Sequence, residues 1–167
     1  MADDPSQSAK TAAEAIAERL NVVARQHVPA ASGIARLTRV TAGATQEIWR
    51  FDLTQGGTDT PMILRRAPGG TRVSATGVGL ESEAELLRAA AAEGVPVPAV
   101  RHVLTPEDGL GHGFIMAFVD GETLGGRIVR DERFAATRPK LAYQCGEILA
   151  RLHRRSEEHT SELQSPC

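Results

Sequence analysis

Three apolar segments separated by short turns constrain the fold of this chain more than any other feature. Residues 37–40, 48–53 and 61–66 each have the composition of a β-strand, and the turns between them are rich in glycine, alanine and threonine. Turns of this length join antiparallel neighbours, because a crossover between parallel strands needs a dozen or more residues. The sequence therefore predicts an antiparallel meander over residues 37–66.

A helix is expected before this meander. Residues 11–27 are rich in alanine, and they repeat apolar side chains at helical spacing, at Ile16, Leu20 and Val23. This repeat predicts an amphipathic helix whose apolar stripe packs against another element.

A second helix is predicted over residues 81–93, with Leu86 and Leu87 as its expected buried stripe. The run Gly-Val-Pro-Val-Pro at 94–98 ends it, because proline cannot continue a helix. Two strands and two helices are expected after this stop, at residues 99–104, 113–119 and 124–134 and from Pro139 onward. The order of elements predicts an α+β fold with a five-stranded antiparallel sheet.

Composition and charge restrict the function classes. The 167 residues are 41% hydrophobic and 24% charged, which fits one soluble globular domain or two small lobes. The formal net charge is −2, and no dense basic patch favours a nucleic-acid partner. The longest strongly apolar run, residues 114–119, is far shorter than the roughly 20 residues of a membrane span. The acidic start carries no apolar leader, so we expect a cytoplasmic protein without a membrane partner.

Several common kinds of site are excluded by spacing. Cys145 and Cys167 make neither a disulfide framework nor a CxxC motif. The five histidines show no HxxxH, HxH or HExxH spacing, so no metal site is expected. The Walker pattern, the dinucleotide fingerprint and the GxSxG elbow are also missing from the sequence.

The turn at residues 41–46 and the strand that ends near Arg65 are the first candidates for a ligand site. Small residues in the turn would let backbone N–H groups approach phosphate oxygens, although an ordinary hairpin turn explains the same residues. Period-two alternation places Arg65 on one face with Ile63, while Arg66 is expected in solvent on an edge strand. One helical glutamate is expected to pair with Arg65, unless all three are solvated: Glu81, Glu83 or Glu85.

Taken in order, five features resemble the small lobe of the aminoglycoside phosphotransferase and choline kinase family. They are the Gly-Ala-Thr-Gln turn, Ile-Leu-Arg at 63–65, Glu83, Gly-Val-Pro-Val-Pro at 94–98, and Phe-Ile-Met-Ala-Phe-Val-Asp-Gly at 114–121. The resemblance covers residues 34–154, and it is strongest to the branch related to phosphotransferase domains fused to acyl-CoA dehydrogenases. It implies a protein-kinase-like small lobe followed by the first helices of a truncated large lobe.

The resemblance implies an ATP site in that lobe. The turn would cover the phosphates, and Arg65, in place of the usual lysine, would contact them with Glu83 as its ion-pair partner. Ile63 would lie over the adenine and Met116 at the back of the pocket, while the carbonyl of residue 117 and the N–H of residue 119 would bond the adenine edge. The implied nucleotide-binding residues are Gly43, Ala44, Thr45, Gln46, Ile63, Arg65, Glu83, Met116, Ala117 and Val119.

The same resemblance identifies what the sequence lacks. The family carries His-Gly-Asp, then four residues and an Asn, then a second metal-binding Asp, whereas the only asparagine here is Asn21. After Val119 the only aspartates are Asp120 and Asp131, and neither follows His-Gly. We therefore expect no catalytic and no metal-binding residue in this chain, and Mg²⁺ only in a complete parent enzyme.

The end of the chain is interpreted as foreign to the fold. Residues 155–165 resemble the translation of a common sequencing adapter, so residues 155–167 are expected to be an artefact tail. The expected organisation is then a helical extension at 1–33, an ATP-binding lobe at 34–119, and a hinge with the start of a helical lobe at 120–154.

Two classes of function remain. One is the ATP-binding part of a phosphotransferase that moves the γ-phosphoryl of ATP to an unidentified small hydroxyl substrate, incomplete and inactive alone. The alternative is a non-catalytic nucleotide-binding or scaffold module, and a chain that binds no nucleotide would favour a fragment without function. Self-association is also expected, through an apolar stripe that the missing lobe would cover, at Leu141, Cys145, Ile148 and Leu152.

Overall fold

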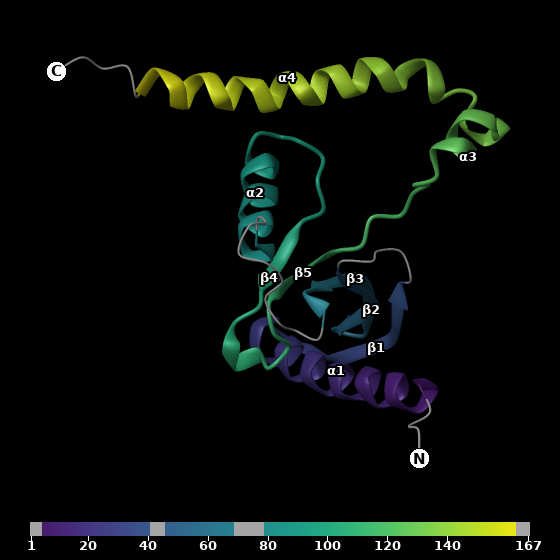
Figure 1. Cartoon of the computed structure of the whole chain (residues 1–167), viewed down its shortest axis with the longest axis vertical. Helices are drawn as coiled ribbons and strands as arrows, with labels where there is room; N and C mark the ends of the chain where they lie inside the picture. Colours follow the sequence, from purple (N-terminus) through teal and green to yellow (C-terminus); the bar gives the residue numbers. More distant parts are fainter. Residues whose placement is uncertain (1–4, 41–45, 69–78, 163–167) are drawn as a thin grey trace. The chain divides into compact units, whose positions relative to one another are not determined.

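The computed structural model describes residues 5–40, 46–68 and 79–162 of the chain (Figure 1). The order of its elements confirms the predicted succession and the α+β class. The elements are α1 (Pro5–His27), β1 (Ala31–Val40), β2 (Glu47–Gln55), β3 (Thr58–Arg66), α2 (Leu80–Ala92), β4 (Val100–Val103), η2 (Pro106–Asp108), β5 (Gly113–Ala117), α3 (Gly125–Arg130), η3 (Glu132–Phe134) and α4 (Arg138–Glu162).

The boundaries differ most from the prediction at β1 and after β5. β1 begins at Ala31, where it pairs with Gln55, and a register shift after Ala35 interrupts its apolar alternation. Because of this irregularity, the alternation of apolar and polar residues did not predict the first half of the strand. The helix expected over residues 124–134 is two short segments, α3 and η3, because Asp131 between them has extended backbone angles.

β3 is the central strand of a five-stranded sheet with the order β1-β2-β3-β5-β4. It pairs antiparallel with β2 on one side and with β5 on the other. Leu64 lies opposite Trp49 of β2 and Ile115 of β5. Side chains that pair across strands share a face, so these three belong to one side of the sheet.

The main core lies between this face of the sheet and α1, which runs alongside the strands (Figure 1). Ile16, Leu20 and Val23 are all buried, which confirms the predicted stripe of the first helix. The strands contribute the larger side chains to the cluster, among them Trp49, Phe51, Met62, Leu64 and Ile115.

α2 buries Leu80 and Ala84. These residues are one helical turn apart and therefore lie on the same side of the helix. The prediction of Leu86 in the buried stripe is wrong, because Leu86 is 63% exposed and lies six residues after Leu80, on another side. Leu87 is half-buried.

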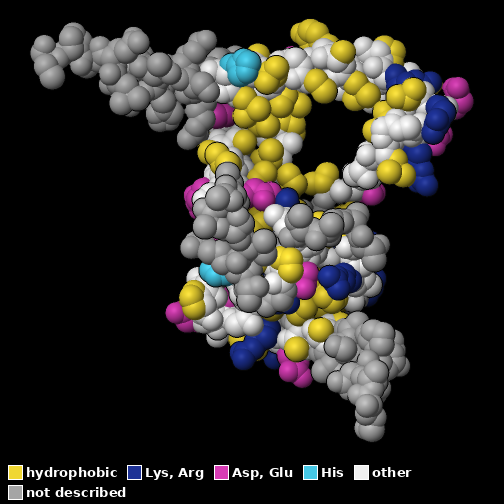
Figure 2. All heavy atoms as spheres, viewed as in Figure 1, with side chains coloured by type: hydrophobic (Ala, Val, Ile, Leu, Met, Phe, Trp, Pro, Cys, Tyr) yellow, Lys and Arg dark blue, Asp and Glu magenta, His cyan; other side chains and the backbone are white. Residues whose placement is uncertain are grey.

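Contacts between residues divide the chain into two compact units, one of residues 1–86 and 98–118 and one of residues 87–97 and 119–167. In the second unit, Arg151 of α4 donates to the carbonyl oxygen of Gly94 at 2.7 Å. Hydrophobic side chains are visible on the surface of α4 (Figure 2). They include Tyr143, Leu149 and Leu152, which are 72%, 52% and 39% exposed.

No helix in the described part of the chain combines the length and the apolar character that crossing a bilayer requires.

Candidate functional site

Arg65, near the end of β3, is the centre of the candidate site. Its Nη1 is 2.6 Å from Oε1 of Glu83 on α2, and its Nε donates to Oε1 of Gln46 at 2.5 Å. The side chains of Arg65 and Glu83 are each 30% exposed, so the pair is accessible to a ligand. The structure thus brings together three of the residues named from the sequence. The remaining members of the predicted turn lie outside the described residues: Gly43, Ala44 and Thr45.

Strand pairing explains which side chains lie beside Arg65. Ile63 is directly opposite Met116 of β5, and residues 63 and 65 share a face because strand side chains alternate. This is the face opposite α1, since Met62 and Leu64 pack into the core with that helix. Ile63 is buried and Met116 half-buried. Two apolar side chains therefore share this face of the sheet with Arg65.

The end of β5 is fixed to both of its neighbours. The N–H of Ala117 donates to the carbonyl oxygen of Ala99 at 2.9 Å, and the N–H of Phe118 donates to that of Pro61 at 3.1 Å. Val119 is 64% exposed and belongs to the second unit. The contacts of Ala117 and Val119 with an adenine edge stay predictions.

The first turn of α2 is anchored beside the sheet, and this positions Glu83. Oε1 of Glu81 is 2.7 Å from Nδ1 of His112, which immediately precedes β5. Ala84 is fully buried, as is Phe114, which pairs with Arg65 across the strands. Glu83 therefore projects from a helix that is held by both packing and polar contacts.

Arg66 is not in solvent, so the sequence prediction for this residue is wrong. Its side chain is only 13% exposed, and its Nε is 2.8 Å from Oε2 of Glu47, which is 15% exposed. Its Nη1 also donates to the carbonyl oxygen of Leu110 at 3.0 Å. The reason is the strand order: β3 lies between β2 and β5 and has no free edge. Arg66 is therefore part of the framework.

The arrangement around Arg65 suits an anionic ligand. A guanidinium carries five N–H donors in a planar fork, which matches the oxygens of a phosphate or a carboxylate. Glu83 and Gln46 engage Nη1 and Nε, and this fixes the plane of the fork. Ile63 and Met116 add an apolar surface of the kind that lines small-molecule sites. A ligand that carries an anionic group and an apolar group matches this combination.

Two carboxylates that follow β5, those of Glu122 and Asp131, do not fit a magnesium site. Oε2 of Glu122 is 2.7 Å from Nη2 of Arg133, and its Oε1 accepts the N–H of Leu124 at 3.0 Å. This hydrogen bond, with the charges of Arg127 and Arg133, holds the pKa of Glu122 below its ordinary value. Oδ2 of Asp131 is 3.1 Å from Nε of Arg133. Both carboxylates are paired with arginine within their own unit, and they do not form a site for Mg²⁺.

A five-stranded antiparallel sheet, a helix that carries a glutamate, and a basic residue paired with it on the third strand define a kinase-like small lobe. The model of the phosphotransferase enzyme family matches residues 36–165, more than half of the chain. The chain belongs to this phosphotransferase enzyme family. No curated protein and no solved structure matched it.

The family match confirms the resemblance at the level of the family and its kinase-like transferase class. The closer relation to domains fused to acyl-CoA dehydrogenases stays a prediction. The origin of residues 155–167 also stays a prediction, although the match extends to residue 165 and α4 continues to Glu162.

Sequence reasoning missed one group of chemically capable side chains: His27, His102 and Asp108, which meet beside α1. They come from three elements. His102 and Asp108 are only six residues apart, but His27 lies 75 residues before His102, so no motif spacing predicted the group. The only local signal was Thr105-Pro-Glu-Asp108, which has the spacing of a capping box.

Proposed function

We propose that this chain binds ATP on the face of the sheet that carries Arg65, and that it corresponds to the nucleotide-binding part of a small-molecule phosphotransferase. The complete reaction class would be transfer of the γ-phosphoryl group to a hydroxyl substrate. The observation that carries the proposal is the position of the Arg65 guanidinium, which is held by Glu83 at 2.6 Å and by Gln46 at the end of the predicted phosphate-covering turn.

Physical chemistry supports phosphate as the ligand of Arg65. An ion pair this accessible contributes little to stability by itself, because solvent screens exposed charges. Holding the guanidinium in one orientation instead lowers the entropy lost when an anion binds. The adenine ring would then lie against Ile63 and Met116, which pair across β3 and β5 on the same face.

We further propose that the chain binds nucleotide without transferring its phosphoryl group. The sequence has no His-Gly-Asp, and its only asparagine, Asn21, lies in α1. Glu122 and Asp131 are each paired with Arg133, which disfavours both as replacements for the metal ligands of the family motif. Mg²⁺ and a catalytic aspartate would belong to a complete parent enzyme, and its hydroxyl substrate is not identified by any residue here.

Titration with a fluorescent ATP analogue tests the proposal. Arg65→Ala should weaken binding about tenfold or more, because charge-assisted hydrogen bonds contribute about 1.5 to 3 kcal/mol. The matched control is Arg19→Ala, an exposed arginine on α1, which packs on the opposite face, and it should leave binding unchanged. Arg65→Lys should restore part of the affinity, since it keeps the charge and loses the fork.

Each result has a distinct meaning. Equal weakening by Arg65→Ala and Arg19→Ala would refute the assignment of Arg65, provided that circular dichroism shows both variants folded. Nucleotide binding without release of phosphate agrees with the proposal. Turnover by the purified chain would refute the proposal that the chain does not transfer the phosphoryl group. No binding at any tested concentration would favour a fragment without function.

A further inference from the structure

A second site of different chemistry lies at the end of α1, on the side of the sheet opposite Arg65. His27 is the last residue of α1, His102 is on β4, and Asp108 is in the η2 turn between β4 and β5. Nε2 of His102 is 2.7 Å from Oδ2 of Asp108, and Nε2 of His27 is 3.3 Å from Oδ1. Both imidazoles thus direct their Nε2 atoms to the same carboxylate.

The carboxylate at the centre of this group is fixed and buried. Asp108 is only 3% exposed, and its Oδ2 accepts the N–H of Thr105 at 2.8 Å and the Thr105 hydroxyl at 3.3 Å. These bonds engage one oxygen and leave Oδ1 directed toward His27. Polar groups that orient a ligating carboxylate in this way are typical of protein metal sites.

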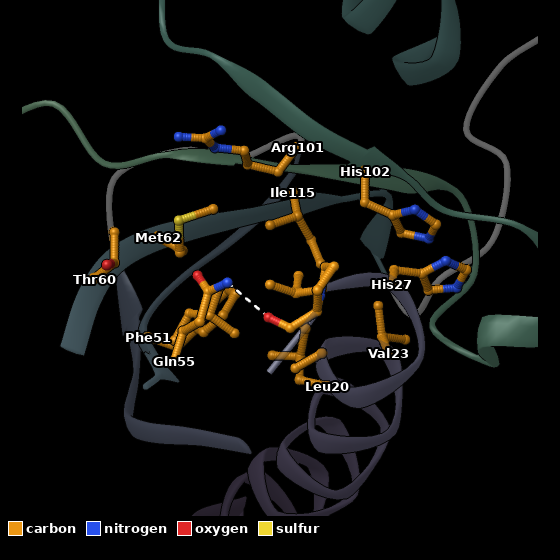
Figure 3. Close-up of a pocket in the computed structure, with 14 residues that line it drawn as sticks. Leu20, Val23, His27, Phe51, Gln55, Thr60, Met62, Arg101, His102 and Ile115 are labelled. Atoms are coloured by element: carbon orange, nitrogen blue, oxygen red, sulfur yellow. Dashed lines mark hydrogen bonds between the residues drawn. The ribbon is translucent and has the colours of Figure 1, made fainter. Parts of the chain in front are cut away.

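The two histidines lie together at one end of a cavity of about 360 Å³ (Figure 3). Their rings stack with centroids 4.1 Å apart and an interplanar angle of 25°. The cavity wall beside them is mainly apolar and includes Leu20, Val23 and Ile115. A ligand or a water molecule could therefore approach the imidazoles from the cavity.

The distances within the group are close to those of a metal coordination sphere. One potential ligand atom from each residue lies within 4.8 Å of the other two. Bonds of about 2.0 to 2.2 Å from zinc to imidazole nitrogen and carboxylate oxygen place tetrahedral ligand atoms roughly 3.3 Å apart. Small side-chain rotations would bring all three atoms around one ion. Imidazole donors favour Zn²⁺ and similar transition metals over Mg²⁺ or Ca²⁺.

We propose that His27, His102 and Asp108 form a binding site for one divalent transition-metal ion, with Zn²⁺ as the best-matched ion and a water molecule as the fourth ligand. The ion would join the end of α1 to β4 and to the turn that follows it. This site uses none of the residues assigned to the nucleotide, so the proposal of a metal site does not depend on the proposed function.

Zinc titration of the tag-free full chain, after chelator treatment and dialysis, tests this proposal. Calorimetry should give one Zn²⁺ per chain, and Co²⁺ should produce visible absorption bands of a four-coordinate site. His27→Phe keeps the ring stacking and removes the nitrogen, and it should weaken Zn²⁺ binding about tenfold or more. Asp108→Asn should have the same effect. His153→Phe, an exposed histidine of α4, is the matched control and should leave binding unchanged.

The thermal unfolding midpoint provides a second measurement, since an ion that binds only the folded chain must raise it. Zn²⁺ should raise the midpoint of the original chain and of His153→Phe, but not that of His27→Phe. His27 is 41% exposed, so this variant tests the site even if Asp108→Asn does not fold. Absence of stoichiometric binding, or binding that His27→Phe leaves unchanged, would overturn the proposal in favour of a purely hydrogen-bonded cluster.

Discussion

Replacing Arg66 by methionine should destabilise the first compact unit by about 2 to 4 kcal/mol. Methionine keeps much of the apolar stem but removes the hydrogen bonds to Glu47 and to the carbonyl oxygen of Leu110. Hydrogen bonds to charged groups contribute about 1.5 to 3 kcal/mol, and breaking a fully buried pair costs about 3 to 5 kcal/mol. Glu47 retains 15% exposure, so water reaches part of the carboxylate and the cost falls between these two ranges, at about 2 to 4 kcal/mol.

Urea unfolding followed by the fluorescence of Trp49 measures this loss. Trp49 is the only tryptophan and is 5% exposed, so its emission reports the core of this unit. Its indole Nε1 is 3.4 Å from Oε2 of Glu47, so circular dichroism should be recorded in parallel to detect a purely local change. The control is Arg101→Met on the edge strand β4, where the arginine is exposed and the expected change is within about 0.5 kcal/mol.

A double-mutant cycle then separates the ion pair from other effects of the substitution. Glu47→Gln should also destabilise the unit, and the double variant should lose less than the sum, with a coupling of about 0.5 to 3 kcal/mol. The reasoning would be refuted if Arg66→Met cost no more than Arg101→Met, or if the two substitutions were additive. Either result would mean that Arg66 is solvated in solution.

Two further predictions concern the second unit. Leu152 is 39% exposed and Cys145 is exposed, so the chain should self-associate through the α4 stripe. Sedimentation velocity at tens of micromolar in reductant should show a mass that increases with concentration. A single monomeric species would contradict this prediction. The hydrogen bond from Leu124 and the charges of Arg127 and Arg133 lower the pKa of Glu122. The stability that ionised Glu122 contributes is therefore present above its pKa in the unfolded chain, and it is lost as the pH falls through its pKa in the folded chain. The chemical shift of the Leu124 amide proton should therefore follow this ionisation with a midpoint below the ordinary pKa of a glutamate, and a midpoint at or above that pKa would contradict the pairing.

Much of the fold was predictable because it depends on local patterns. The spacing of Ile16, Leu20 and Val23 identified the buried side of α1, and these residues are all buried. Alternation along β3 placed Ile63 and Arg65 on one face, and the register with β5 agrees. Helical and strand periodicities follow from backbone geometry, so they can be read without knowing what each element packs against.

The candidate site was predictable in part for a related reason. Arg65 and its acidic partner lie in consecutive elements, and alternation together with a short list of glutamates limited the possible pairs. The ion pair with Glu83 is present in the structure, while its function toward a nucleotide stays a prediction. The same local logic could not decide which of two adjacent arginines faces solvent.

Only the tertiary structure decided the environment of Arg66, the buried side of α2 and the group around Asp108. The chain inserts β5 beside β3, which makes β3 central and encloses Arg66, but no residue within β3 specifies that neighbour. His27 and Asp108 meet because α1 packs across the sheet as far as the β4–β5 turn. Contacts of this kind depend on which elements become neighbours, and that choice is made by burial of the whole core and not by any local pattern.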